Sequence, residues 1–89
     1  MTPRYHRHAD LRLTALAGEG VVLHMKERRY FTVNETGLTI LEALREPKSF
    51  EELVAAILAE YEVTREEAER TTREFLTRCS EAGLLEERA

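Results

Sequence analysis

The sequence predicts an α+β fold in which a three-stranded antiparallel sheet is followed by three helices. Short apolar runs separated by glycines and charged residues fill positions 11–33, as expected of strands joined by tight turns. Two Ser/Thr-x-x-Glu patterns then begin at Ser49 and Thr64, and such patterns are typical of helix starts. With 89 residues, the chain is expected to form one domain with a small core.

The predicted strands occupy the first part of the chain. Residues 11–16 alternate apolar and polar side chains until a pair of glycines, which is typical of a half-buried strand. Residues 21–25 and 29–33 flank a charged tip, so we expect them to pair as a hairpin. Residues 1–9 are expected to form a flexible tail, and residues 10–89 the folded domain.

Each predicted helix has a recognisable start or end. Asn34 is expected to cap the first helix, because its side-chain oxygen can accept a free backbone N–H, and Pro47 is expected to end it. Gly83 is expected to end the third helix in a left-handed turn. The buried stripe of the third helix is predicted to be Ala68, Thr72, Phe75, Cys79 and Ala82. Leu76 lies about 100° from Phe75 around the helix, so we expect it at the edge of this stripe and within reach of a ligand.

Charge is divided unevenly along the chain. The net charge is −4, yet residues 1–33 carry six basic and three acidic side chains, whereas residues 34–89 carry seven basic and fourteen acidic ones. The strand region is thus the cationic part of an anionic protein, which favours an acidic or amphipathic partner there over nucleic acid. The sequence has no long apolar run and no signal-like N-terminus, so we expect a cytoplasmic protein that does not enter a membrane.

Few residues have the pattern of a catalytic or metal site. His6, His8 and Asp10 are metal-ligand types, but a third fixed donor is missing and neighbouring arginines repel a cation, so we expect a solvated segment. His24 is expected to be a partly exposed structural residue, and Cys79, the single cysteine, a small core residue. The sequence shows no Ser/His/acid or Cys/His group and no glycine-rich phosphate loop. We therefore expect no enzyme activity, no metal and no cofactor.

The helix-turn-helix arrangement beside a strand hairpin leaves winged-helix DNA binding as an alternative. A DNA-binding helix normally presents a basic stripe, whereas residues 65–81 contain four arginines and five glutamates. Much of this charge is expected to be neutralised by i, i+4 pairs, namely Glu66–Arg70, Glu69–Arg73 and Glu74–Arg78. Nucleic acid is therefore the less favoured partner.

The third predicted strand offers a different kind of binding surface. If it lies at the edge of the sheet, its free N–H and C=O groups are a template for an added strand, and no proline blocks residues 29–33. The alternative is that Arg28 and Arg29 protect this edge from aggregation. Both interpretations fit the composition.

Several short motifs follow the pattern of a known family. The residues concerned are Val33-Asn34 at the strand-to-helix step, the region of Gly37, Phe75-Leu76, and Gly83-Leu84. Over residues 12–86 the chain resembles the PqqD-like family, and it departs from the family pattern at Cys79, where leucine is usual, and at Thr71, where aspartate is frequent. The resemblance implies a winged helix-turn-helix-like fold that recognises the leader segment of a ribosomally synthesised, post-translationally modified peptide (RiPP).

The resemblance also implies how recognition takes place. The leader would pair as an added strand with the third strand, in the groove against the third helix. The residues implied for peptide binding are Arg28, Arg29, Tyr30, Phe31, Thr32, Val33, Glu69, Thr72, Arg73, Phe75, Leu76 and Cys79. The chain is most similar to the separate leader-binding subunit of lasso peptide systems, whose partners are a cysteine-protease-like leader peptidase and an ATP-dependent cyclase. A PQQ-type peptide chaperone acting with a radical enzyme is the alternative within the same family.

Overall fold

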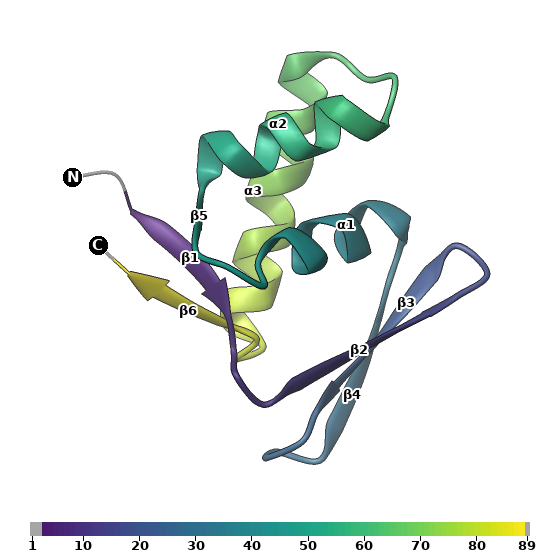
Figure 1. Ribbon diagram of the computed structural model, residues 1–89, viewed down its shortest axis with the longest axis vertical. Coiled ribbons are helices and arrows are strands. Elements are labelled where there is room, and N and C mark those ends of the chain that lie inside the picture. The colour runs from purple at the N-terminus through teal and green to yellow at the C-terminus, as the bar shows by residue number, and fades with distance from the viewer. Residues whose placement is uncertain (1–2, 89) are drawn as a thin grey trace.

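The computed structural model describes residues 3–88, with side chains up to Glu86, as two small sheets and three helices (Figure 1). In chain order the elements are β1 (Arg4–Arg7), β2 (Leu11–Leu16), β3 (Glu19–His24), β4 (Arg29–Val33), α1 (Glu35–Ala43), β5 (Lys48–Ser49), α2 (Phe50–Glu60), α3 (Arg65–Glu81) and β6 (Leu85–Arg88). One sheet has the strand order β2-β3-β4 and the other β5-β1-β6. The predicted α+β fold, with a three-stranded antiparallel sheet and three helices, is confirmed, and the second sheet adds to it.

The β2-β3-β4 sheet is a meander of two consecutive hairpins. Its register places Val22 opposite Phe31 and Gly20 opposite Val33. Val22 and Val33 are buried under the helices, whereas Tyr30 on the other face of β4 is 72% exposed. Among the described strands, β4 pairs only with β3, so one edge of β4 is free. The expected hairpin is confirmed, and the third strand lies at the edge of the sheet, which is the condition for strand addition.

The β5-β1-β6 sheet joins the two ends of the chain. β1 pairs along its whole length with β6 and over two residues with β5. Arg7 also ties β1 to α1, because its N–H donates to the Leu44 carbonyl (3.2 Å) and its guanidinium to the Leu41 carbonyl (3.1 Å). The expectation of a flexible tail over residues 1–9 is therefore wrong for residues 4–7. The partner strand of β1 lies at the other end of the sequence, so no local sequence pattern indicates this pairing.

Helix starts follow the capping residues that the sequence predicts. Asn34 Oδ1 accepts the N–H three residues on at 2.8 Å, and α1 follows it. At the start of α2 the Ser49 hydroxyl accepts the Glu52 N–H (3.2 Å), while the Glu52 carboxylate accepts the Ser49 N–H (2.9 Å), which completes a capping box. Within the described residues, Thr64 forms only the hydroxyl half of its predicted box, at 3.1 Å.

Helix ends agree with the prediction in one of two cases. α3 ends in a Schellman turn, in which the Leu84 N–H donates to the Cys79 carbonyl (2.9 Å) and Gly83 has φ +75°. α1, by contrast, ends at Ala43, well before the Pro47 that was expected to end it. The Leu44 carbonyl accepts the Arg7 N–H of β1, and Pro47 has no N–H to donate to the Ala43 carbonyl, so both features fit an end at Ala43.

The core lies between the helices and the inner face of the meander. Its largest fully buried apolar side chains are Val22, Ile40, Leu41, Leu44, Leu53, Val54 and Ile57. Cys79 is buried as predicted, and burial raises the pKa of its thiol to about 12. His24 was expected to be partly exposed but is buried: its Nδ1 accepts the Glu27 N–H (3.3 Å), and its ring centroid lies 4.6 Å from that of His8.

The helices are short or strongly charged. Over the described part of the chain, no helix combines the length and the apolar composition needed to cross a lipid bilayer. The same residues contain no group of three or more His, Cys, Asp or Glu side chains placed to hold a metal ion.

Candidate peptide-binding site

The free edge of β4 is the first component of the candidate site. β4 has five residues, and its inner side is held by β3 from Arg29 opposite His24 to Val33 opposite Gly20. Along an antiparallel strand, alternate residues direct their N–H and C=O groups to either side, so the outer side of β4 presents unpaired backbone groups. Phe31 is half-buried on the helix-facing side, and the Arg29 guanidinium lies 5.1 Å from the centroid of its ring.

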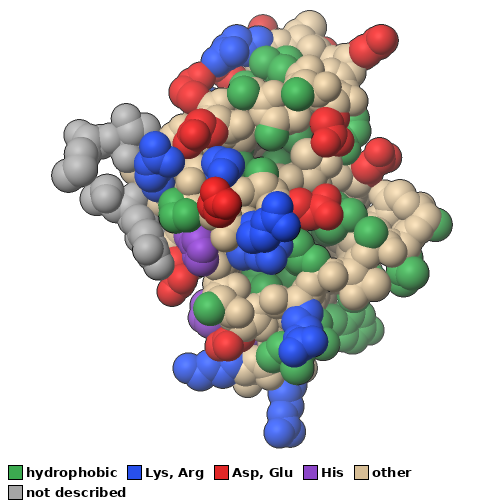
Figure 2. Space-filling view, in the orientation of Figure 1, with side chains coloured by type: hydrophobic (Ala, Val, Ile, Leu, Met, Phe, Trp, Pro, Cys, Tyr) green, Lys and Arg blue, Asp and Glu red, His purple; other side chains and the backbone are tan. Residues whose placement is uncertain are grey.

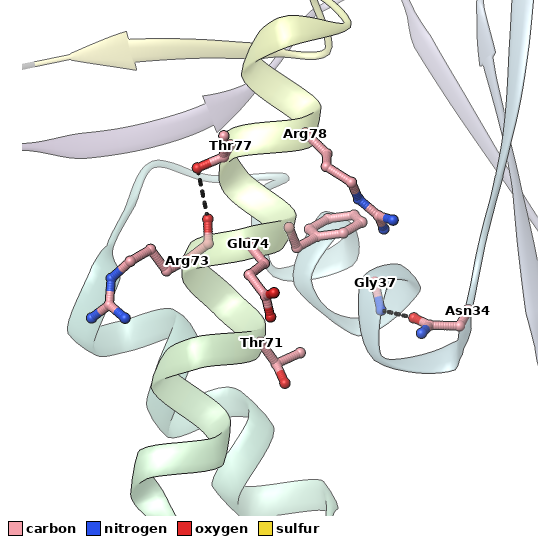
Figure 3. A pocket seen from close by; sticks show the side chains of 8 residues that line it. Asn34, Gly37, Thr71, Arg73, Glu74, Thr77 and Arg78 are labelled. Atoms are coloured by element: carbon pink, nitrogen blue, oxygen red, sulfur yellow. Dashed lines mark hydrogen bonds between the residues drawn. The ribbon is translucent and has the colours of Figure 1, made fainter.

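A groove between the start of α1 and the side of α3 is the second component. It has a volume of about 650 Å³ and begins directly after β4. Its lining residues are Asn34, Gly37, Thr71, Arg73, Glu74, Phe75, Thr77 and Arg78. Figure 3 shows Thr71, Glu74 and Arg78 projecting from α3, with Arg78 directed towards the α1 start, where Asn34 and Gly37 lie. Asn34 lines the groove and directly follows β4, so the groove lies next to the end of that strand.

Phe75 forms the apolar floor of this groove because Gly37 leaves room for its ring. A Cβ added at Gly37 would lie 2.7 Å from Phe75 Cε1, closer than carbon atoms approach, and 3.1 Å from Cζ, which is also tight. The guanidinium of Arg78 lies 5.9 Å from the Phe75 ring centroid, at the outer limit of a cation–π contact. An apolar side chain that entered the groove would meet an aromatic surface with a cation beside it.

The arginines of α3 are arranged differently from the sequence expectation. None of the three predicted i, i+4 pairs is formed among the described residues; Arg65 instead pairs with Glu69 (3.4 Å) and with Glu51 of α2. Arg73 lies over the Phe50 ring, 5.4 Å from its centroid, and Arg78 lies over Phe75. Among the described residues, Arg65–Glu69 is thus the one ion pair within α3, and Arg73 and Arg78 lie over aromatic rings instead. Figure 2 shows acidic side chains mainly over the helices and basic ones extending past the turn between β3 and β4.

The structure brings together only part of the predicted peptide-binding set. The edge residues Arg28, Arg29, Tyr30, Phe31, Thr32 and Val33 are contiguous on the β3–β4 turn and β4, and Arg73 and Phe75 line the adjoining groove. Thr72 and Cys79 are instead buried in the core, and Glu69 is engaged by Arg65.

Leu76 differs most from its expected position. It is 6% exposed and Phe75 is 5% exposed, so the two are buried to the same degree rather than one at the edge of the stripe. Leu76 lines cavities with Tyr5 and Phe50 on another side of α3, and Phe75 lines the groove. Because the two side chains are about 100° apart around the helix, each lines a different cavity.

Sequence reasoning missed six residues of the groove. They are Asn34, Gly37, Thr71, Glu74, Thr77 and Arg78. One signal was present: Thr71 and Arg78 stand four residues before and three residues after Phe75, which places them on its side of the helix. Asn34 was recognised as a helix cap and, with Gly37, as part of the family motifs, but neither was predicted to line a binding site.

Together, the meander and the three helices define a small winged-helix-like α+β domain with a free strand edge beside a groove. The chain belongs to the PqqD family, because the family model for coenzyme PQQ synthesis protein D matches residues 19–85. The predicted resemblance is confirmed.

Solved structures of similar proteins agree with this assignment. The chain is similar to the one in "TbiB1 in Complex with the TbiA(beta) Leader Peptide", with 36% identity, a TM-score of 0.78, and coverage of 91% of this chain and 94% of that one. A second similar structure, "Lasso peptide synthetase B1 complexed with the leader peptide", is 23% identical with a TM-score of 0.75, covers 92% of this chain and 96% of that one, and supports the fold alone. A comparison with curated proteins gave no match.

Proposed function

We propose that this chain binds the leader segment of a ribosomally synthesised precursor peptide as a strand added to β4, and presents it to the leader peptidase and the cyclase of a lasso peptide pathway. The observation that carries the proposal is the free edge of β4 beside the groove floored by Phe75. The 36% identical TbiB1 was solved in complex with a leader peptide, which supports the same ligand class here.

Backbone pairing would supply affinity that depends little on sequence. Each hydrogen bond between β4 and the leader would contribute about 0.5–1.5 kcal/mol net, so a short strand binds only moderately by this means. Specificity would come from a leader side chain that enters the groove and packs on Phe75, next to Arg78 and Glu74. A single groove on one side of the added strand selects side chains at alternate leader positions.

The chain would act by presentation rather than by catalysis. Holding the leader near an enzyme raises the effective concentration of the attached core peptide to about the millimolar range. The enzymes would then supply the chemistry, and this domain would supply recognition.

Titration with the TbiA(beta) leader peptide tests the proposal. We expect ¹⁵N amide shifts along residues 29–33 and on the Thr71–Arg78 side of α3, and no shifts with a scrambled peptide of the same composition. Shifts confined to α1 and α2, or no shifts with the leader, would contradict it. Duplex DNA is expected to leave these amides unmoved, and DNA-dependent shifts on α3 would favour the winged-helix alternative.

A matched pair of charge reversals tests the groove without touching the core. Arg78→Glu removes the cation beside Phe75, and we expect leader affinity to fall about tenfold. Arg70→Glu makes the same charge change at an exposed position of α3 that does not line the groove. Equal losses in the two variants would show a general charge effect and would contradict recognition by the groove.

A further inference from the structure

α3 carries a second hollowed surface, which no residue of β4 lines. On the side of α3 next to β1 and the start of α2, two adjoining cavities have volumes of about 240 and 250 Å³. They share Tyr5, Leu76 and Thr77; one is completed by Phe50 and Arg73, and the other by Ser80 and Glu81. We refer to this pair, lined by Tyr5, Phe50 and Leu76, as the far cavity.

The far cavity has an apolar floor and a polar rim. Leu76 is buried, and the half-buried rings of Tyr5 and Phe50 converge on it from β1 and α2. Arg73 lies over Phe50, 5.4 Å from the ring centroid, and Ser80 and Glu81 line the opposite end. Apolar surface of this kind, bounded by polar groups, suits one or two apolar side chains of a peptide better than a helix or a domain.

The far cavity is continuous with the groove. Arg73 and Thr77, both exposed, line the groove as well as the far cavity, so these two residues form the ridge between the two surfaces. In Figure 3, Arg73 points away from Asn34 while Arg78 points towards the α1 start. A helix with its side chains is about 10–12 Å wide. An extended peptide advances about 3.3 Å per residue, so roughly three or four residues would cross the ridge.

We propose that the same peptide that adds to β4 continues over Arg73 and Thr77 and inserts an apolar side chain into the far cavity. This inference rests on the proposed function and adds a second anchor to it. The leader would then contact both sides of α3, with the anchoring side chain at least three residues from the segment paired with β4. The second sheet, through Tyr5 of β1, becomes part of the binding surface.

Site-specific photocrosslinking with the TbiA(beta) leader tests the path of the peptide. A p-benzoylphenylalanine is placed at one of three positions: Tyr5 in the far cavity, Thr71 in the groove, or Arg12 on the outer face of the meander as a control. We expect crosslinks from Tyr5 and Thr71 but not from Arg12. The leader residues captured at Tyr5 should lie at least about three positions from those captured at Thr71.

The outcomes separate this inference from the function it rests on. Crosslinks from Thr71 without crosslinks from Tyr5 would contradict insertion of the leader into the far cavity, but they would still support leader binding. Absence of crosslinks from both would contradict leader binding itself. Crosslinks from both positions to the same leader residue would overturn the crossing path, because one side chain cannot occupy both surfaces.

A blocking variant gives an independent measurement. Ser80→Trp fills the far cavity from its rim, and we expect the affinity of the full leader to fall about tenfold, the effect of losing one buried apolar side chain. A leader peptide truncated to the segment that crosslinks at Thr71 should bind both proteins equally. A full-leader affinity that is unchanged in Ser80→Trp, with an unchanged melting temperature, would overturn the inference.

Discussion

The two sheets of this small domain have three strands each, but they are built in opposite ways. The β2-β3-β4 meander pairs strands that follow one another in the chain, and every strand of it has a recognisable sequence pattern. The β5-β1-β6 sheet pairs the N-terminal strand with the C-terminal one and with two residues before α2. Local pairing follows from short turns and alternating side chains, whereas non-local pairing needs the helices already in place.

The difference also separates two roles in binding. The meander supplies an open edge, and β4 has backbone groups ready for a further strand. The other sheet pairs the first described strand with the last one and contributes Tyr5 to the far cavity. We expect the function to need both, because α3 presents a different side to each sheet.

Removal of residues 2–8 is expected to have the largest effect on stability. It eliminates the β1 ladders, the packing of Tyr5 and the hydrogen bonds of Arg7, which together should cost about 5 kcal/mol. That loss is comparable to the whole stability of a small domain, so thermal unfolding followed by circular dichroism should show a shallow transition or none. A melting temperature within a few degrees of the full chain would restore the flexible-tail interpretation.

Phe75→Ala and Leu76→Ala compare the two sides of α3. Both side chains are buried, so we expect each variant to lose about 2–5 kcal/mol in urea unfolding. Their binding should differ: Phe75→Ala removes the groove floor and should weaken even a short, strand-only peptide, whereas Leu76→Ala should weaken only the full leader. Identical affinity losses for both peptides in both variants would show that stability alone is being measured.

Each sheet also delivers the capping residue of a helix. Asn34 follows β4 and caps α1 with one hydrogen bond, while Ser49 in β5 caps α2 with a buried, two-way box. We expect Ser49→Ala to cost about 1–2 kcal/mol and Asn34→Ala about 1 kcal/mol in the free energy of unfolding. Chemical denaturation of both variants, with Glu42→Ala at an exposed position of α1 as a reference, measures the difference. A larger loss at Asn34 would contradict this order.

The smallest expected effect is an acid-range pH dependence at the β5 end of α2. The hydrogen bond from the Ser49 backbone N–H holds the pKa of the Glu52 carboxyl below its ordinary value, and the nearby Arg4 acts in the same direction. A carboxyl with a lowered folded-state pKa stabilises the fold above its unfolded-state pKa, and the contribution disappears as the pH falls through the folded-state value. Glu52→Gln should therefore be less stable than the parent near neutral pH. The difference in the free energy of unfolding between the two proteins should disappear in acid.

Denaturant curves at several pH values measure this gap. Glu60→Gln, near the other end of α2 and exposed, makes the same substitution away from the box. We expect the gap to be specific to Glu52. A gap that stays constant down to acid pH would show that Glu52 acts through packing rather than through its charge.

Sequence reasoning succeeded where a signal is contained within a few residues. Asn34, Ser49 and Gly83 were recognised because capping needs one side chain, or one left-handed residue, at a fixed offset from the helix. The sequence predicted the hairpin of β3 and β4 but left the edge position of β4 open, and the strand order of the folded sheet decided it. Family membership, too, was indicated by short motifs at these same junctions.

The groove was harder to predict because the packing of α3 against the start of α1 decides which residues line it. The expected pairs between glutamates and arginines on α3 satisfied the helix spacing, yet Arg73 and Arg78 lie over aromatic rings of α2 and of α3 itself. A surface ion pair contributes little, so a flexible arginine readily lies along an available aromatic face instead. Helical spacing predicted which side chains lie close together, but it did not predict which of these neighbours each arginine contacts.

By itself, the sequence determined the strands of the meander, the starts of the helices, the turn after α3 and the family to which the chain belongs. Each of these depends on interactions within one turn or one hairpin, which short patterns encode. Only the tertiary structure decided that the N-terminal segment is a strand, that Leu76 and Phe75 face different cavities, and that Gly37 admits the Phe75 ring. These features depend on contacts between residues far apart in the chain, and their geometry is fixed only when the helices pack against both sheets.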